Sequence, residues 1–378
     1  MTKTTNAAVL GQIGGHNLPY AGSKPLAIQS LDLAPPRSGE LLVRIDAAGL
    51  CHSDLSVIDG NRPRPVPMAL GHEAAATVVE VGGDADTSGS DFSAGDKVVL
   101  VFLPSCGNCP QCLSGEGYLC PEGAAANGKG ELLKGGSRLS CNGHQVHHHL
   151  GVSAFAEYAV IDKRSAVKVD PDIKPAIAAL FGCAVLTGVG AVMNTAQVRP
   201  GESVLIYGLG GVGLAALLGA IASGANPVTV VDPSPEKRAL ALELGAADAK
   251  EPGQDESLFG ADVVIETAGK ASVLERAYAA GGRGSRIVTV GLPHPDEKLA
   301  IPAISLVADS KTLMGSYLGS CIPSRDIPRY IALWKAGRLP VEKLLTSISP
   351  MDDINMLMDR LASGEAVRQI IIPASRTQ

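Results

Sequence analysis

Four of the eight cysteines in this sequence lie close together, at the spacing C-x2-C-x2-C-x7-C. They are Cys106, Cys109, Cys112 and Cys120, in a segment rich in glycine and proline. Thiolates at such short spacings can surround one tetrahedral zinc ion, and four sulfur ligands leave no position for water or substrate. The pattern therefore predicts a structural zinc ion that orders a loop and performs no chemistry. An iron–sulfur cluster uses similar spacings and is the alternative.

A second set of metal-binding side chains is spread over a longer stretch of the chain. Cys51 and His72 lie in Cys51-His52-Ser53-Asp54 and Gly71-His72-Glu73, and Cys183 follows in Gly182-Cys183-Ala184. Two cysteines and one histidine with an open fourth position form a catalytic zinc arrangement. Taken singly, Cys183 fits a buried apolar side chain and His72 a buried structural histidine. The interpretation as a metal site therefore depends on the complete set.

A glycine-rich turn in the second half of the chain points to a nucleotide. Gly208-Leu209-Gly210-Gly211-Val212-Gly213 fits G-x-G-x-x-G, follows the apolar run 203–207 and precedes a helical run. Such glycines let backbone N–H groups approach a pyrophosphate at a helix N-terminus. The next apolar run ends in Asp232, whose carboxylate can bind ribose hydroxyls and would repel a 2′-phosphate. We therefore expect NAD rather than NADP; the structural alternative is a tight turn with an aspartate at a strand end.

These residues must be positioned by two different kinds of structure. The first third alternates apolar and polar residues, as in 40–47 (ELLVRIDA), and strand-like runs recur at 77–81 and 97–102. From Gly201 onward, strands and helices alternate: strands at 203–207, 228–231, 262–266 and 286–291, with helices at 214–222 and 236–244. This alternation predicts a doubly wound parallel sheet of the Rossmann type. The tail returns to amphipathic helices and a strand at 369–372.

Length and composition limit the class of protein. The 378 residues favour two domains, and 46% apolar with 19% charged residues excludes intrinsic disorder. A net charge of −6 and only 3% aromatic residues argue against nucleic acid or an anionic membrane as partner. The uncharged stretches 175–198 and 203–231 are long enough to span a bilayer, but buried strand–turn–helix units give the same hydropathy. The first residues, 1–6, lack the apolar core of a signal peptide, so we expect a cytoplasmic protein.

The order and spacing of these motifs resemble the zinc-containing medium-chain alcohol dehydrogenases. The sequence is most similar to the longer animal-type branch, which includes glutathione-dependent formaldehyde dehydrogenase. The segments 137–155, with His147-His148, and 363–368 (SGEAVR) share in the resemblance. It implies an α/β fold with a β-rich, GroES-like catalytic domain (1–184 and 325–378) that carries both zinc sites. A Rossmann coenzyme domain (185–324) would bind NAD.

The resemblance also implies roles for single residues. Asp54 would hold the zinc-bound histidine, Glu73 would lie behind the metal, and Ser53 would relay the alcohol proton while hydride passes to the nicotinamide. The residues implied to bind the cofactor are His52, Thr187, Gly208, Gly210, Gly211, Val212, Gly213, Asp232, Lys237, Val290, Leu292, Ser316, Leu318 and Arg368, with His52 and Arg368 near the pyrophosphate. The residues implied to line the substrate pocket are Phe102, Leu292 and Tyr317.

Two positions depart from the family pattern. Ser56 stands where many members carry a histidine that ends the proton relay, so a histidine-dependent relay is in doubt. Ala124 stands where the glutathione-dependent branch carries an arginine. An alcohol or aldehyde is therefore the expected substrate, and a thiol adduct of formaldehyde is the alternative. A catalytically silent nucleotide-binding regulatory protein is the alternative of a different class.

The strand-like segment 311–318 (KTLMGSYL) has few charges that would protect a sheet edge. In the resembled family, the corresponding strand pairs with its copy in a second subunit. We therefore expect a homodimer, with a tetramer as the alternative.

Overall fold

The computed structural model describes residues 2–83, 91–254 and 260–373. The chain divides into two compact units, residues 1–183 with 345–378 and residues 184–344. The second boundary lies later than the expected residue 325. Helix α11 (Pro323–Lys335) packs against α6 (Ala184–Gly190), and Tyr330 accepts a 3.3 Å hydrogen bond from Asn194. Residues 325–344 therefore group with the second unit.

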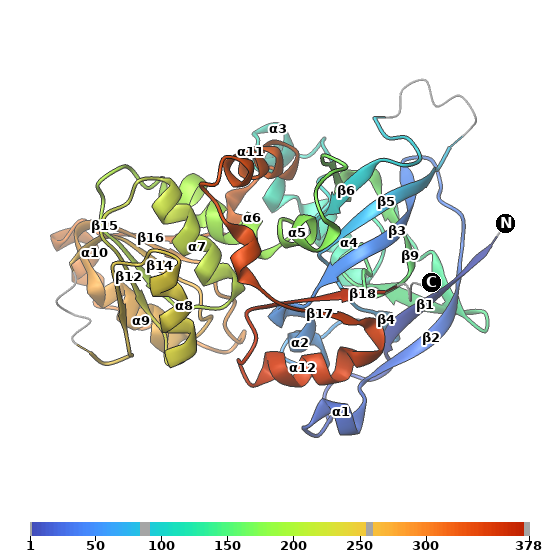
Figure 1. The fold of residues 1–378 in the computed structure, drawn as a ribbon, viewed down its shortest axis with the longest axis horizontal. Helices are drawn as coiled ribbons and strands as arrows, with labels where there is room; N and C mark the ends of the chain where they lie inside the picture. The colour runs from blue at the N-terminus through green and yellow to red at the C-terminus, as the bar shows by residue number, and fades with distance from the viewer. Residues whose placement is uncertain (1, 84–90, 255–259, 374–378) are drawn as a thin grey trace. The chain divides into compact units, whose positions relative to one another are not determined.

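The first unit is built mainly from β-strands, as Figure 1 shows. A closed barrel has the strand order β1-β2-β7-β8-β4, and a larger sheet has the order β10-β6-β5-β3-β18-β17, with β9 paired to β3. Its strands are β1 (Lys3–Leu10), β2 (Leu26–Leu33), β3 (Glu40–Gly49), β4 (Met68–Ala69), β5 (Ala74–Val81), β6 (Lys97–Leu100), β7 (Leu139–Cys141), β8 (His144–His148), β9 (Tyr158–Asp162), β10 (Ala166–Lys168), β17 (Leu345–Pro350) and β18 (Arg368–Ile372).

Short helices connect these strands and carry the chemistry-bearing residues at their ends. They are α1 (Tyr20–Ser23), α2 (His52–Ile58), α3 (Pro110–Leu113), α4 (Pro121–Lys129), α5 (Pro175–Leu180) and α12 (Ile354–Ala362), with 3₁₀ turns at Gly117–Leu119, Lys163–Ser165 and Met351–Asp353. The apolar faces of β3, β5, β6 and α12 share one buried core, which includes Val43, Leu100 and Leu357. The C-terminal strand β18 pairs antiparallel with β3, Ile370 lying opposite Gly49. Arg368 is thereby brought next to residues from the start of the chain.

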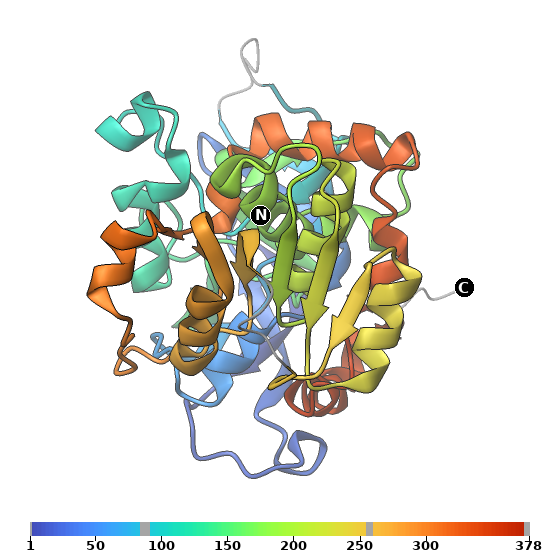
Figure 2. The same cartoon turned by 90° about the vertical axis from the view of Figure 1, so that its left-hand side faces the viewer.

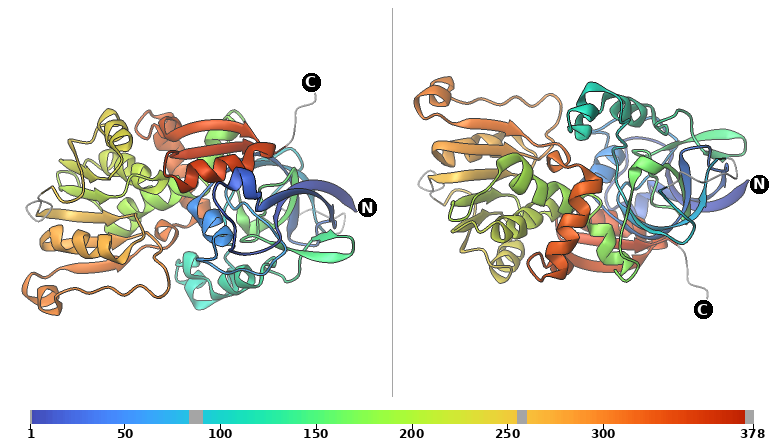
Figure 3. Two further views of the ribbon diagram at one scale, coloured as in Figure 1. Left: turned by 90° about the horizontal axis from the view of Figure 1, so that it is seen from below. Right: turned by 90° about the horizontal axis from the view of Figure 1, so that it is seen from above.

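The second unit is a doubly wound parallel sheet with the order β13-β12-β11-β14-β15-β16 (Figure 2). Helices cover both of its faces, as the views in Figure 3 show. Its elements are α6, the π-helix Ala191–Ala196, β11 (Val204–Tyr207), α7 (Gly211–Ala222), β12 (Val228–Val231), α8 (Pro235–Glu243), β13 (Asp248–Lys250), β14 (Ala261–Glu266), α9 (Ala271–Ala280), β15 (Gly281–Thr289), α10 (Ala303–Ala308), β16 (Thr312–Gly315), α11 and 3₁₀ turns at Leu318–Ser320 and Val341–Leu344.

This arrangement confirms the predicted fold class. The sheet reverses its order between β11 and β14, and ligands of open α/β sheets bind outside the carboxyl ends of strands at such a point. The two uncharged stretches are accounted for by buried strands and helices. Within the ranges that the structure describes, no helix has both the length and the apolar character needed to cross a bilayer.

Candidate functional site

Cys51, His72 and Cys183 converge in the first unit. One ligand atom from each lies within 4.8 Å of the others, although the residues come from the end of β3, the loop before β5 and the residue before α6. Cys51 is the N-cap of α2, where its sulfur accepts from the backbone of Asp54 and the Asp54 carboxylate accepts from the N–H of Cys51. This reciprocal cap fixes both side chains at the start of the helix. The predicted set of three is thus brought together.

Asp54 holds the imidazole of His72. Its Oδ1 lies 3.1 Å from Nδ1 of His72 and accepts a 3.1 Å hydrogen bond from the Gly71 N–H. Burial opposes ionisation of Asp54, but His72 and His149 outweigh it and lower the pKa of the carboxyl below its usual range. With Nδ1–H donated to Asp54, Nε2 of His72 is left as the nitrogen that can bind a metal.

The pKa values of the two thiols shift in opposite directions, and that of the imidazole is raised. A hydrogen bond from Cys183 lowers the pKa of Cys51 well below its usual range, and His72 adds to this effect. The same hydrogen bond, together with burial, raises the pKa of Cys183. Burial alone would lower the pKa of His72, but Asp54 and Cys51 raise it to about 10. One thiolate is therefore already favoured here, and a cation between the three groups would displace the remaining protons.

Glu73 directly follows His72 in the chain and is paired with Arg368. The ion pair joins the loop before β5 to the first residue of β18, and the side chains are 0% and 4% exposed. Gly49 is required beside it, because a Cβ atom there would overlap the Glu73 carboxylate. Arg368 was expected near a pyrophosphate, and its partner in the first unit is this carboxylate. Phe102 packs edge-on against His72, with ring centroids 5.7 Å apart.

The sulfur atoms of the four-cysteine loop are spaced as ligands of a single tetrahedral ion would be. The Sγ atoms of Cys106 and Cys112 are 3.9 Å apart, and those of Cys109 and Cys120 are 4.0 Å apart. Four sulfurs at about 2.3 Å from one zinc ion would be about 3.8 Å from each other. A cluster of several iron and sulfide ions would hold the thiolates further apart, so the separations favour the zinc interpretation.

Backbone N–H groups point at these sulfurs. Cys120 Sγ accepts from Cys106 at 3.2 Å and from Gly123 at 3.4 Å, and Cys106 Sγ accepts from Cys109 at 3.3 Å. Burial opposes ionisation of Cys120, but its two N–H donors outweigh it and lower the pKa to about 7. Burial raises the pKa of Cys112 to about 12. The loop therefore partly prepares its thiols to bind a cation.

The nucleotide residues of the second unit gather at the carboxyl ends of its strands. Gly208 follows β11 with a φ of 89°, and a Cβ on Gly213 would collide with the Gly208 carbonyl. Asp232 follows β12; its Oδ2 accepts a 2.6 Å hydrogen bond from Leu209 in the glycine turn, and its Oδ1 accepts from Ser234 at 2.8 Å. Each oxygen keeps a lone pair for a ribose hydroxyl. The aspartate thus both fixes the turn and can bind a ligand.

Other expected cofactor residues lie at the same edge or at its neighbouring helices. Val290 and Ser316 follow β15 and β16; Val290 N–H donates to Glu266 at 2.8 Å and Ser316 N–H to Thr289 at 2.9 Å. Thr187 and Val212 lie where α6 meets α7, since a Cβ on Gly188 between them would collide with the Val212 carbonyl. Leu318 is buried, Lys237 lies in the first turns of α8, and Leu292 and Tyr317 are exposed.

His52 and Ser53 lie in the first turn of α2, His52 exposed and Ser53 half-buried. They belong to the first unit, as does Phe102, whereas Leu292 and Tyr317 belong to the second. The structure therefore groups the metal-type ligands in one unit and the glycine turn with Asp232 in the other.

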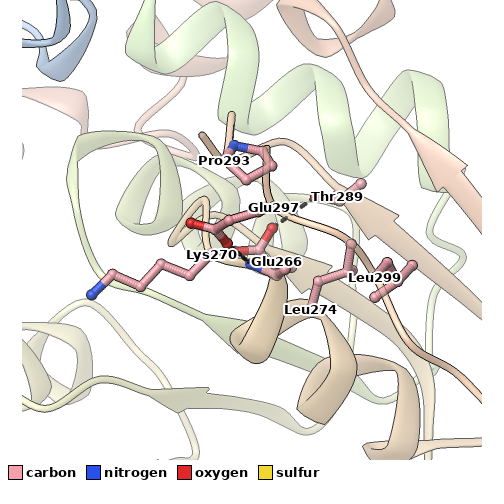
Figure 4. Close-up of a pocket in the computed structure, with 8 residues that line it drawn as sticks. Glu266, Lys270, Leu274, Thr289, Pro293, Glu297 and Leu299 are labelled. Carbon is pink, nitrogen blue, oxygen red and sulfur yellow. Dashed lines mark hydrogen bonds between the residues drawn. The ribbon is translucent and has the colours of Figure 1, made fainter. Parts of the chain in front are cut away.

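A pocket lies beside β14, and the space within it, including the part that is open to solvent, is about 310 Å³ (Figure 4). Its most buried carboxylate, Glu266, accepts from Gly269 N–H and from Thr289 Oγ1, both at 2.7 Å. Both oxygens are thus used to hold the strand ends near Val290. The lining residues are Glu266, Lys270, Ala271, Leu274, Thr289, Pro293, Glu297 and Leu299.

Sequence reasoning missed one buried histidine next to the metal-type cluster, His149, and gave no role to its buried neighbour His148. His149 Nδ1 lies 3.1 Å from Asp54 Oδ1, and the rings of His149 and His72 pack edge-on with centroids 5.4 Å apart. His148 accepts from the Arg138 N–H at 3.1 Å. The available signal was the uninterrupted run of three histidines, 147–149, at the end of a strand. Because side chains alternate along a strand, the side chains of His148 and His149 are expected to face opposite sides.

A sheet with this strand order and an acidic residue after its second strand, joined in one chain to a buried cluster of thiols and an imidazole, defines a zinc-binding dehydrogenase. Comparison with known proteins agrees. Residues 37–171 match the family model "Alcohol dehydrogenase GroES-like domain", and residues 211–336 match "Zinc-binding dehydrogenase".

Individual relatives extend over nearly the whole chain. S-(hydroxymethyl)glutathione dehydrogenase of Synechocystis is 35% identical over 92% of this chain and 96% of that protein. Geraniol dehydrogenase of Castellaniella defragrans is 37% identical over 98% of each. The crystal structure of benzyl alcohol dehydrogenase from Acinetobacter calcoaceticus has a TM-score of 0.90 at 30% identity, covering 98% of this chain and 100% of that one. The chain belongs to the zinc-dependent alcohol dehydrogenase family and is an oxidoreductase.

Proposed function

We propose that this chain oxidises alcohols to aldehydes or ketones with NAD as hydride acceptor, and catalyses the reverse reduction, with zinc held by Cys51, His72 and Cys183. The observation that carries the proposal is the convergence of these three ligand atoms within 4.8 Å. Two thiols and one imidazole suit zinc, and three donors leave a fourth tetrahedral position for a substrate oxygen. When bound there, zinc supplies the Lewis acidity that makes the alcohol easier to deprotonate.

The remaining residues position groups and move a proton. Asp54 orients His72, and Glu73 with Arg368 provides a neutral, buried ion pair beside the cluster. Ser53 is the proposed acceptor of the alcohol proton, since its hydroxyl both accepts and donates. Ser56, one turn later on α2, has no imidazole to continue the relay, so the proton would leave through the cofactor ribose to water. Phe102 is the proposed pocket wall in the first unit.

The second unit supplies the proposed NAD site. The glycine turn gives the pyrophosphate access to the N-terminus of α7, and Asp232 would bind the adenosine ribose. Backbone groups of Val290, Ser316 and Leu318 are proposed to hold the nicotinamide amide, with Thr187 and Val212 against its ring. His52, Lys237, Leu292 and Arg368 are the further proposed cofactor contacts, and Leu292 and Tyr317 the proposed pocket residues of this unit.

The four-cysteine loop is proposed to bind a second, structural zinc, giving two per chain. The eight cysteines are free thiols, which suits the reducing cytoplasm. A homodimer is proposed, with a tetramer as the alternative: among the strands that the structure describes, β16 pairs with β15 alone, and nearby Ile304 and Val307 of α10 are 73% and 80% exposed. An edge strand with exposed apolar neighbours favours pairing with a second copy.

The similar proteins support two different classes of substrate. Proteins named for geraniol and benzyl alcohol support a primary alcohol next to an unsaturated carbon. The similarity to S-(hydroxymethyl)glutathione dehydrogenases supports a thiol adduct as second candidate. Ala124, exposed on α4, offers no charge to a glutathione carboxylate, so we favour the alcohol.

The test compares Cys51→Ser with Cys141→Ser, which alters a free cysteine outside both clusters. Zinc per chain, NADH binding and oxidation of benzyl alcohol, geraniol and hexanol are measured, together with formaldehyde plus glutathione. We expect Cys51→Ser to lose one zinc and several orders of magnitude in turnover, roughly 10³-fold or more, while NADH binding persists. Cys141→Ser should match the parent. Retention of two zinc ions and substantial turnover in Cys51→Ser would refute the site.

A further inference from the structure

One buried histidine beside the metal-type cluster has no part in the function proposed above. His149 follows β8 and is 1% exposed. Its backbone N–H donates to Ser153 Oγ at 3.1 Å, and its carbonyl accepts from Val152 at 3.0 Å, so the backbone that carries the ring is fixed. The ring stands edge-on to His72 at an interplanar angle of 89°. This placement puts an imidazole, rather than an apolar ring, directly beside a proposed zinc ligand.

The only charged group at hydrogen-bond distance from the His149 ring, among the described residues, is Asp54. Nδ1 of His149 lies 3.1 Å from Asp54 Oδ1, off the axis of an aligned hydrogen bond, and has no aligned partner within the described ranges. An ionised carboxylate only accepts, so this nitrogen must carry the proton if the two are to attract. A buried N–H without an acceptor is unfavourable. The carboxylate is therefore the group that compensates it.

We propose that His149 is a positioning residue of the metal site: it holds the Asp54 carboxylate, which in turn holds His72 with Nε2 toward the metal. The inference rests on the zinc site proposed above. Asp54 is otherwise fixed by Cys51 and Gly71, through one 3.1 Å hydrogen bond to each carboxylate oxygen. His149 adds a support from β8, a different part of the fold. Outer groups that orient a ligating histidine strengthen metal binding.

The adjacent His148 provides a matched control. It is also fully buried, but its partners are the Arg138 N–H at 3.1 Å and the Ser153 hydroxyl at 3.3 Å. Replacing either histidine disturbs the same short segment at the end of β8. Only replacement of His149 removes a donor to Asp54.

The experiment measures zinc affinity of the full-length protein by competition with a fluorescent chelator. The release step that disappears in Cys51→Ser identifies the three-ligand site, and the four-cysteine site serves as internal control. His149→Phe keeps an aromatic ring without a donor, whereas His149→Asn places an amide N–H near the position of Nδ1. We expect His149→Phe to weaken the three-ligand site by roughly tenfold and His149→Asn to recover most of that loss. His148→Asn should leave the affinity as in the parent.

His149→Leu is a second variant without a donor, in case the phenyl ring disturbs packing; a filled four-cysteine site reports that the unit is folded. Weakened zinc binding in both variants, with recovery in His149→Asn, supports the inference. Parent-like affinity in a folded donorless variant, or no recovery in His149→Asn, overturns it. If Cys51→Ser leaves both release steps in place, the zinc site itself fails, and the two failures are thus distinguished.

Discussion

We expect the folded protein to become less stable in mild acid, because the buried ring of His148 must stay neutral. Nε2 accepts the Arg138 N–H, which leaves Nδ1–H to face Ser153, so this geometry requires a neutral ring. Burial, with Arg138 and His147 as further causes, lowers the pKa of His148 to about 3. Its value in an unfolded chain is about 6.5. The unfolded state therefore binds the proton more tightly, and protonation favours unfolding as the pH falls below about 6.5.

The size of the effect follows from the difference between the two pKa values. Each pH unit below the unfolded value costs about 1.4 kcal/mol until the pH nears the folded value. From pH 6.5 to pH 5.0 the stabilising contribution of the neutral ring should thus fall by about 2 kcal/mol. By pH 3 the loss would reach about 4 kcal/mol, which is close to the whole stability of a marginally stable domain.

The assay compares the parent with His148→Gln, whose amide oxygen can still accept from Arg138 but does not titrate. Urea unfolding is followed by circular dichroism, because the single tryptophan, Trp334, lies in the second unit and would not report on the first. The free energy of unfolding of the parent, relative to that of the variant, should fall by about 2 kcal/mol between pH 6.5 and pH 5.0. His144→Gln, at an exposed position of the same hairpin, should follow the parent. A difference in unfolding free energy between parent and variant that stays constant over this pH range would refute the reasoning.

Three further outcomes are expected. Cys109→Ser should lower the zinc content by one and the Tm by several degrees, with KM nearly unchanged; a variant as stable as the parent but inactive would contradict the structural role. Asp232→Gly should shift the NAD/NADP ratio of kcat/KM toward NADP by roughly tenfold or more, helped by Arg238, whose Nη1 lies 2.6 Å from the Asp232 carbonyl; an unchanged ratio would assign cofactor choice to another residue. Met314→Pro should remove a ladder position in β16 and lower both the mass in sedimentation and the NADH affinity, whereas a monomeric parent would refute the proposed dimer.

The local patterns that predicted the sheet of the second unit left its element ends open. The expected helix at 214–222 begins at Gly211, because Gly210 is its N-cap and the glycine turn runs directly into the helix. Strand β15 begins at Gly281 rather than at 286, since Gly281 pairs with Ala261 of β14 although the glycines at its start carry no strand signal. Hydrophobic periodicity identifies the middle of an element; caps and strand pairing decide where it ends.

The cysteines and His72 could be identified from the sequence because zinc restricts the ligand types and their spacing. The pairs Glu73–Arg368 and Asp54–His149 could not, since each joins residues that only the closed fold brings together. No periodicity links β18 to the loop before β5, nor β8 to α2. Long-range electrostatic pairs of this kind depend on strand order, which becomes visible only once β18 is seen beside β3.

The charges buried around the three-ligand cluster show why these pairs are present. Ionised Cys51, Cys183, Asp54 and Glu73 would carry −4, and Arg368 returns +1, which leaves −3 in a nearly dry environment. Without an ion the site relieves this charge by protonation, which is why the pKa of Cys183 is raised by its hydrogen bond to Cys51 and by burial. A divalent cation would reduce the sum to −1, located on a carboxylate with N–H donors from Cys51, Gly71 and His72. Neutral ligands with the same shape would leave no buried negative charge for Arg368 to balance. A monovalent ion, or an empty and fully ionised site, would leave more negative charge buried than a divalent cation does. These residues therefore fit zinc better than either alternative.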